Sequence, residues 1–232
     1  MKAGIIAAGH GWRLAQSHPD QVKPLVPVAG RPLCHWVAAS LQQAGAKEIS
    51  LLHNSQGRAI RESLKMAFPA VRWTFLQADT ASSWESFRLV SRMLASTDPY
   101  FLVSTADTIA APDDVAEFVR SCRTQPGLAL TSFVDDEKPL WADLVENGMI
   151  TAIGDGSTQR KFVTAGLYHM TAAVAEAMPP AAAHDSLRKY WGGLLAGGTS
   201  IAGFALSKTI DVDRPEDIAQ AEAFLKEAIE AW

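Results

Sequence analysis

The chain has 232 residues, of which 48% are hydrophobic and 20% are charged, and its formal net charge is −4 at pH 7. This hydrophobic fraction is typical of a globular protein and excludes a disordered chain, a collagen-like repeat and a small disulfide-rich scaffold. Acidic residues outnumber basic ones by 25 to 21, and no apolar stretch reaches the ~18 residues of a membrane span. We therefore expect a globular protein whose partners include neither nucleic acid nor a membrane.

The N-terminal segment and the cysteines indicate the cellular compartment. The apolar run after Lys2 covers only residues 3–8, which is too short for a secretory signal peptide. Cys34 and Cys122 lie 88 residues apart in helix-like segments, without further cysteines or histidines at the spacing of a metal site. We expect two buried, reduced thiols and a cytoplasmic protein.

The first half of the chain alternates short apolar runs with segments of helical periodicity. Pro32 opens one such segment, 33–44, and Gly45 ends it, as expected from the preference of proline for helix starts and of glycine for helix ends. Strands separated by helices of 10–15 residues indicate crossover connections, a parallel sheet and helices on both faces. The expected strands are 3–8, 48–53, 71–77 and 100–104; the expected helices are 33–44, 56–68, 81–95 and 111 to about 123.

The second half contains short strands joined by tight turns, and Asn147-Gly148 is a strong hairpin signal. The expected strands are 128–134, 141–145, 149–153, 163–170 and 200–206, and the expected helices are 186–195 and 215–231. We predict a single domain over residues 1–232. Its fold would be α/β: a Rossmann-like three-layer sandwich with a mostly parallel central sheet and a small inserted antiparallel portion.

The loop after the first strand has the composition of a phosphate-binding turn. In open parallel sheets, ligands bind beyond the carboxyl ends of the strands. This loop contains Gly9 and Gly11 but lacks the third glycine of the dinucleotide fingerprint and the Gly-Lys-Ser/Thr of a P-loop. Exposed backbone N–H groups, Arg13 and, ten residues later, Lys23 would suit phosphate oxygens. An ordinary turn with two solvated charges explains the same residues, and both interpretations stay open.

Carboxylates follow two other strands. Asp107, just after strand 100–104, is either a turn residue or a ligand of a hard cation such as Mg²⁺. Near the C-terminus, Asp213 fits a helix N-cap with Glu216 as its capping-box partner, which leaves Asp211 as the freer carboxylate. Two aspartates that hold a metal opposite a cationic loop would suit an enzyme acting on a nucleoside triphosphate.

The segments 5–14 and 23–33 together resemble the signature of the sugar-phosphate nucleotidyltransferases. That signature reads Leu-Ala-Ala-Gly-x-Gly-Thr-Arg-Leu, followed by Pro-Lys-Pro-Leu-x-Pro-Val-x-Gly-x-Pro-Leu. The Asp107 loop, the strand segment 165–168 and the segment 210–217 follow in the order of the family. The resemblance therefore spans nearly the whole chain.

The resemblance implies a role for each matching residue. Arg13 would bind the β- and γ-phosphates of a nucleoside triphosphate, and Lys23 its α-phosphate. Asp107 and Asp211 would bind Mg²⁺. The other implied contacts are Ala8, Gly9 and Gly11 with the nucleotide through their backbone, Gln77 and Thr80 with the base, and Gly166 and Lys161 (or its neighbour Arg160) with the acceptor.

The expected reaction is transfer of a nucleotidyl group from a nucleoside triphosphate to a phosphorylated acceptor, first of all a sugar 1-phosphate. The chain departs from the signature at Trp12, where the family has Thr or Ser, and at Val22, where it has Pro. The segment 81–83, where many members have glycines, resembles members acting on phosphocholine-like or inositol phosphates. The alternatives are a cytidylyltransferase for a phosphorylated alcohol such as phosphocholine, a relative that loads a pterin cofactor, and a catalytically silent nucleotide-binding relative. Homo-oligomerisation stays open.

Overall fold

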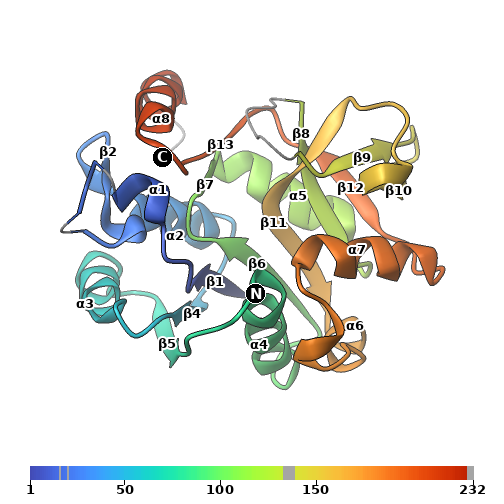
Figure 1. Cartoon of the computed structure of the whole chain (residues 1–232), viewed down its shortest axis with the longest axis horizontal. Helices are drawn as coiled ribbons and strands as arrows, with labels where there is room; N and C mark the ends of the chain where they lie inside the picture. Colours follow the sequence, from blue (N-terminus) through green and yellow to red (C-terminus); the bar gives the residue numbers. More distant parts are fainter. Residues whose placement is uncertain (16, 20, 133–138, 229–232) are drawn as a thin grey trace.

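A mixed β-sheet runs through the centre of the protein (Figure 1). The structure is a computed structural model and describes the chain except residues 16, 20, 133–138 and 229–232. The strand order is β10-β9-β11-β6-β1-β4-β5, and β8 pairs with both β11 and β12. The strands are β1 (Lys2–Ala7), β4 (Glu48–His53), β5 (Arg72–Gln77), β6 (Tyr100–Thr105), β8 (Gly127–Thr131), β9 (Trp141–Leu144), β10 (Ile150–Ile153), β11 (Phe162–Thr171) and β12 (Ala202–Ala205).

The sheet has a parallel part and an antiparallel part. Strands β6, β1, β4 and β5 pair in parallel, so their carboxyl ends meet at one edge of the sheet. Strand β11 then runs antiparallel to β6, β8 and β9, and β9 forms a hairpin with β10. The helices are α1 (Trp12–Ala15), α2 (Leu33–Gln43), α3 (Arg58–Ala67), α4 (Ser83–Ala95), α5 (Pro112–Cys122), α6 (Ala172–Glu176), α7 (Leu187–Ala196) and α8 (Pro215–Ala228).

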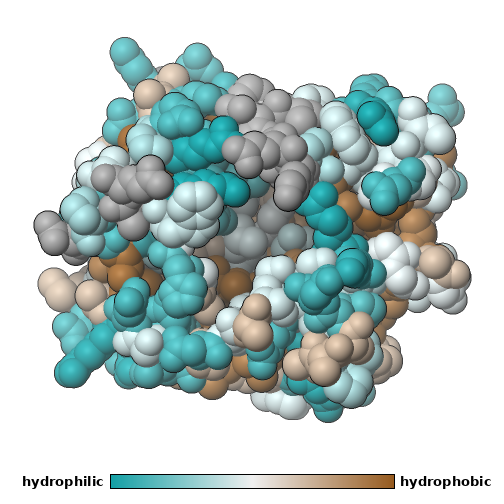
Figure 2. Space-filling view, in the orientation of Figure 1, coloured by the Kyte–Doolittle hydropathy of each residue, from teal (hydrophilic) through white to brown (hydrophobic). Residues whose placement is uncertain are grey.

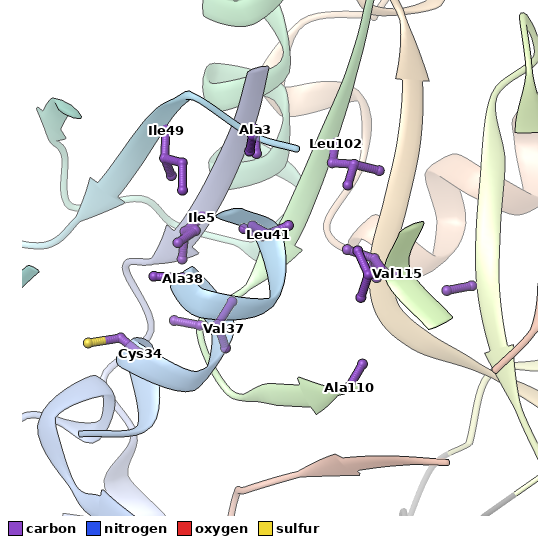
Figure 3. Close-up of a cluster of buried hydrophobic side chains, with 14 of the residues drawn as sticks. Ala3, Ile5, Cys34, Val37, Ala38, Leu41, Ile49, Leu102, Ala110 and Val115 are labelled. Atoms are coloured by element: carbon purple, nitrogen blue, oxygen red, sulfur yellow. The ribbon is translucent and has the colours of Figure 1, made fainter. Parts of the chain in front are cut away.

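Helices cover both faces of the sheet. Alternate residues of β1, Ala3 and Ile5, pack against α2 and belong to the core that α3 and α5 complete (Figure 3). On the opposite face, side chains of α4, α6 and α7 pack on β6 and β8. Gly4 lets α4 approach closely, because a Cβ at this position would lie 2.2 Å from Val90 Cγ1. This arrangement is the predicted three-layer α/β fold, with an antiparallel portion that extends the same sheet.

A third core cluster joins the two ends of the chain. Strand β7 (Thr108–Ala110) pairs antiparallel with β13 (Thr209–Asp211), and the hairpin of β2 (Pro27–Val28) and β3 (Arg31–Pro32) lies near α8. Figure 1 shows α8 beside this small sheet. The pairing aligns Asp211 with Thr108, and it thereby fixes the C-terminal segment beside the loop after β6.

Some elements differ from their predicted extents. Helix α3 begins at Arg58 rather than at residue 56, because the Asn54 side chain accepts a hydrogen bond from the Gln56 backbone N–H and closes a turn there. Helix α1, strand β7 and helix α6 were not predicted from the sequence; each has five residues or fewer. Strand β8 ends at Thr131; residues 133–134 of its predicted extent and 229–231 of the last helix lie outside the described residues.

Two smaller expectations also bear on the fold. Cys34 and Cys122 are both buried free thiols, as predicted. No helix in the part of the chain that the structure describes combines the length and the apolar character that crossing a membrane requires.

Candidate functional site

The loop after β1 packs against the start of a short 3₁₀ helix, Lys23–Leu25. Gly11 has a φ of +60°, and a Cβ at this position would lie 2.4 Å from Lys23 Cβ. A side chain here would therefore meet both backbone strain and a clash. Glycine at this turn lets the stem of Lys23 pass beneath the loop and places its ammonium group at the carboxyl edge of the sheet.

Lys23 is the centre of an ion-pair network. Its Nζ contacts the carboxylates of Asp107 and Asp213, and its side chain is only 11% exposed. Burial alone would lower the pKa of Lys23, but the two carboxylates outweigh it and raise the pKa above its usual value. Arg13 joins the network through a 3.4 Å contact with the second Asp213 oxygen, and its guanidinium lies 5.5 Å from the centre of the exposed Trp12 ring. Both sequence-predicted cations thus lie together at the loop after β1.

Asp107 lies in the turn between β6 and β7, and Asp211 is the last residue of β13, the strand that pairs with β7. The Val212 backbone N–H donates to the Asp107 carbonyl at 3.1 Å, and the Thr108 hydroxyl donates to the Asp211 carboxylate at 2.6 Å. Burial would raise the pKa of Asp107, but the adjacent Lys23 holds it below its usual value.

Asp211 has the opposite electrostatic environment. Burial and the negative charges of Asp107 and Asp213 raise the pKa of Asp211 to about 7. The Asp211 side chain is exposed to the larger of the pockets described below, so water screens part of this repulsion. Repulsion between neighbouring carboxylates opposes the ionisation of Asp211, and a divalent cation bound between them would relieve that repulsion. In the described residues no group of three or more His, Cys, Asp or Glu side chains forms a metal site. A pair of carboxylates fits Mg²⁺, which proteins bind through one or two carboxylates together with substrate phosphates.

The predicted capping role of Asp213 is wrong. The carboxylate that caps this turn belongs to Asp217, which accepts hydrogen bonds from the backbone N–H groups of Asp213 at 2.8 Å and Arg214 at 2.7 Å. Asp217 lies in the first turn of α8 and is buried, so its carboxylate satisfies donors that precede the helix. The side chain of Asp213 is thereby left to contact the cations.

Two adjoining pockets open at this edge of the sheet. The larger has a volume of about 470 Å³ and extends toward β11 and α7; the smaller, of about 230 Å³, lies against the loop after β1. Arg13, Asp107 and Asp213 line both pockets, and we call these three residues the seam. Figure 2 shows hydrophilic residues gathered around a hollow near the centre of this face. Two ligands bound side by side would meet at the seam.

The sequence-predicted residues divide between the pockets. The smaller pocket is lined by Gly9, Gly11, Arg13, Lys23 and Asp107, and the larger by Arg13, Asp107, Gly166 and Asp211. Four others line neither pocket: Ala8, Gln77, Thr80 and Lys161. Thr80 bonds the Ser86 hydroxyl at 2.6 Å, Gln77 is exposed at the end of β5, and the Lys161 ammonium lies 5.1 Å from the Phe162 ring centre. Their proposed ligand contacts stay predictions.

Sequence reasoning missed other residues of the larger pocket. Tyr168 and Trp191 stack with ring centres 5.7 Å apart on one wall, and Arg188 of α7 and Arg214 add positive charge. Asp213 was seen but assigned to the helix. The available signal was its spacing of two residues from Asp211, which in an extended segment puts both side chains on the same side.

Comparison with known proteins identifies the family of the chain. A sequence model described as "MobA-like NTP transferase domain" matches residues 3–191. The chain is 45% identical over 64 residues to N-acetylmuramate alpha-1-phosphate uridylyltransferase of Neisseria meningitidis, a match that covers 28% of each chain. It is 39% identical over 77 residues to the bifunctional protein GlmU of Aromatoleum aromaticum, which covers 33% of this chain and 16% of that protein. The matches thus span less than a third of the length of these curated relatives.

Solved structures share the fold over nearly the whole chain. The inositol-1-phosphate CTP transferase of T. maritima superposes with a TM-score of 0.81 at 20% identity, covering 97% of this chain and 96% of that one. A putative glucose-1-phosphate thymidylyltransferase of Bacillus anthracis gives the same TM-score and identity, covering 98% and 96%. At such identities the likeness supports the fold alone. The family model, which spans most of the chain, supports more: this protein belongs to the family of MobA-like NTP transferase domains.

Proposed function

We propose that this protein transfers a nucleotidyl group from a nucleoside triphosphate to a phosphorylated acceptor, releasing pyrophosphate, with Mg²⁺ as its cofactor. The seam is the observation that carries the proposal. A triphosphate in the smaller pocket would have its phosphates beside Arg13 and Lys23, and an acceptor in the larger pocket would approach from the opposite side. The two substrates would therefore meet where the cations are concentrated.

The reaction needs positioning and charge more than proton transfer. A phosphate monoester has a second pKa of about 6, so the acceptor is largely a dianion at neutral pH and needs no general base. One of its oxygens forms a bond to the α-phosphorus, and the bond from the α-phosphorus to the bridging oxygen breaks. Pyrophosphate leaves with that electron pair. Lys23 would neutralise charge on the α-phosphate and Arg13 charge on the departing group, since preorganised cations in a partly enclosed site stabilise a transition state.

Asp107 and Asp211 would hold the metal ion. Mg²⁺ bound there would add positive charge beside the phosphates and help to orient them. Removing such a group costs on the order of 10²-fold or more in rate. We expect Asp107→Ala and Lys23→Ala to reduce turnover by at least that factor while the chain stays folded, as measured by pyrophosphate release and circular dichroism. Wild-type turnover by Asp107→Ala would contradict the metal assignment.

The lining of the larger pocket supports a sugar 1-phosphate as the acceptor. Hydroxyl groups suit a ring that carries O–H groups, and the small exposed part of Tyr168 adds an apolar contact for its C–H groups. The serine and threonine residues there are Ser83, Thr105, Thr131, Thr164, Ser186 and Thr209. Two of the proteins above, the N-acetylmuramate alpha-1-phosphate uridylyltransferase and the glucose-1-phosphate thymidylyltransferase, are named for a sugar phosphate. Arg188→Ala should therefore raise the KM of the acceptor.

A phosphorylated alcohol is the second candidate for the acceptor. One of the two solved structures above is an inositol-1-phosphate CTP transferase, and the serines of segment 81–83 gave the same indication from the sequence. In the structure Ser82 caps α4 by accepting from the Glu85 N–H, while the Ser83 hydroxyl accepts from the Leu187 N–H and lines the larger pocket. Ser83 therefore lines the pocket whose side chains would determine the acceptor specificity.

The test is a pyrophosphate-release screen that crosses four nucleoside triphosphates with phosphorylated sugars, phosphocholine and inositol phosphates, with and without Mg²⁺. Mg²⁺-dependent release with one acceptor class is the expected result. Tight triphosphate binding without release from any pair would instead favour the catalytically silent relative.

A further inference from the structure

Asp213 bridges the two cations of the site. One of its carboxylate oxygens contacts Lys23 Nζ, and the other lies 3.4 Å from the Arg13 guanidinium. The three residues come from opposite ends of the chain, 190 and 200 residues apart. The proposed transfer reaction assigns roles to Arg13 and Lys23, but it does not use Asp213.

The bridge stands on a fixed support. Asp217 anchors the backbone of the Asp213 turn by accepting two N–H bonds, and Val212, next to Asp213, is fully buried in the core beneath α8. The Val212 N–H also bonds the Asp107 carbonyl. The carboxylate of Asp213 therefore projects from a turn that the fold itself holds in place.

Long cationic side chains need such a support. Lysine and arginine side chains have many rotamers, and this conformational freedom must be lost before their charges act at a defined point. Lys23 is fixed by two carboxylates from different loops. The side chain of Arg13 is 38% exposed. Among the described residues, its charged group contacts only the Asp213 carboxylate and the Trp12 ring. Without Asp213, Arg13 would keep only a solvent-exposed ring to orient it.

We infer that Asp213 is a positioning residue for the proposed transfer: its carboxylate holds the Lys23 ammonium and the Arg13 guanidinium at a fixed separation where the two pockets meet. The inference rests on the proposed function. Asp213 has a second, opposite electrostatic effect, because its negative charge repels a triphosphate. The two effects predict opposite results for variants, so an experiment can separate them.

The experiment compares Asp213→Asn and Asp213→Glu with Glu216→Gln, a matched control. Glu216 is exposed in the first turn of α8, so this change removes one negative charge from the same helix end without touching the bridge. For each protein we would measure kcat and KM with the best substrate pair, the affinity for the Mg²⁺–triphosphate complex by calorimetry, and the unfolding midpoint.

Asp213→Asn should lower kcat by about 10- to 100-fold, the range expected when reacting groups lose alignment, and should weaken triphosphate binding. Asp213→Glu keeps an acceptor for both cations and should recover part of kcat. Arg13→Ala should cost less in the Asp213→Asn background than in the wild type, because the same alignment is already lost.

Three results would overturn the inference. These are an Asp213→Asn kcat within twofold of the wild type, a loss no larger than that of Glu216→Gln, and tighter triphosphate binding by Asp213→Asn, which would mean that Asp213 competes with the phosphates. If the wild type releases no pyrophosphate with any pair, the proposed function fails instead. The binding data then decide alone: weaker affinity in Asp213→Asn than in Glu216→Gln supports the bridge, and equal or tighter affinity refutes it.

Discussion

Gly166→Ala should destabilise the protein strongly, because this glycine lies where a side chain has no room. Gly166 sits at an irregularity of β11 with a φ of +57°. A Cβ there would lie 2.2 Å from the Thr108 hydroxyl oxygen and 2.8 Å from that of Thr105. The left-handed backbone costs about 1–2 kcal/mol for a residue with a Cβ, and overpacking costs about 1–3 kcal/mol more. We expect a loss of about 2–5 kcal/mol in the free energy of unfolding.

Urea unfolding followed by tryptophan fluorescence measures this loss, and Gly156→Ala is the matched control. A Cβ at Gly156 would have no atom within 4 Å, and the φ of this residue is not positive, so its substitution should cost nothing. In a Thr108→Ala background the closest clashing atom is gone, so the cost of Gly166→Ala should fall, although the 2.8 Å approach to the Thr105 hydroxyl oxygen and the backbone cost remain. A Gly166→Ala protein within about 0.5 kcal/mol of the wild type would refute the steric reasoning.

Three further predictions concern other parts of the structure. Trp12→Ala should raise the triphosphate KM about two- to fivefold, the equivalent of a cation–π contact of about 0.5–1 kcal/mol with Arg13, and Trp12→Phe should restore most of it. Asp143→Ala should cost about 2–3 kcal/mol in urea unfolding, because its buried carboxylate accepts hydrogen bonds from residues 157–159. Burial alone would raise the pKa of Asp143, but these hydrogen bonds hold it below its usual value. The stabilisation from these bonds should therefore be present above about pH 4 and be lost as the pH falls through the lowered pKa. An unchanged acid unfolding profile in Asp143→Asn would contradict this. Chelation of Mg²⁺ with EDTA should abolish pyrophosphate release, and added Mg²⁺ should restore it; release that persists in EDTA would remove the metal from the mechanism.

The repeated, periodic elements were predictable from the sequence. Strand β4 matches its predicted extent, 48–53, and helices α2 and α4 differ from theirs by two residues or fewer. Their apolar residues recur at strand or helix spacing, which the order of residues alone reveals. The free, buried state of Cys34 and Cys122 followed from the same patterns.

Contacts between segments that lie far apart in the sequence were not predictable. Strand β7 has three residues, too few for a periodic pattern, yet its pairing with β13 brings Asp211 beside Thr108. The role of Asp213 failed for a related reason. Local helix rules predicted that Asp213, three positions before Glu216, caps the helix. In the structure the Asp213 side chain instead points toward Lys23, a tertiary contact. A sequence shows which groups are charged, but which cation a carboxylate meets depends on the fold.

The position of a divalent ion beside a bound triphosphate is the most direct test of the site. Anomalous diffraction from crystals grown with Mn²⁺ and a non-hydrolysable triphosphate would locate the ion, and the electron density of the same crystals would locate the phosphates. Convergence of the four groups predicts one peak between the carboxylates of Asp107 and Asp211, with phosphate oxygens in contact with Arg13 and Lys23. A peak away from both aspartates, or phosphates bound outside the smaller pocket, would contradict it.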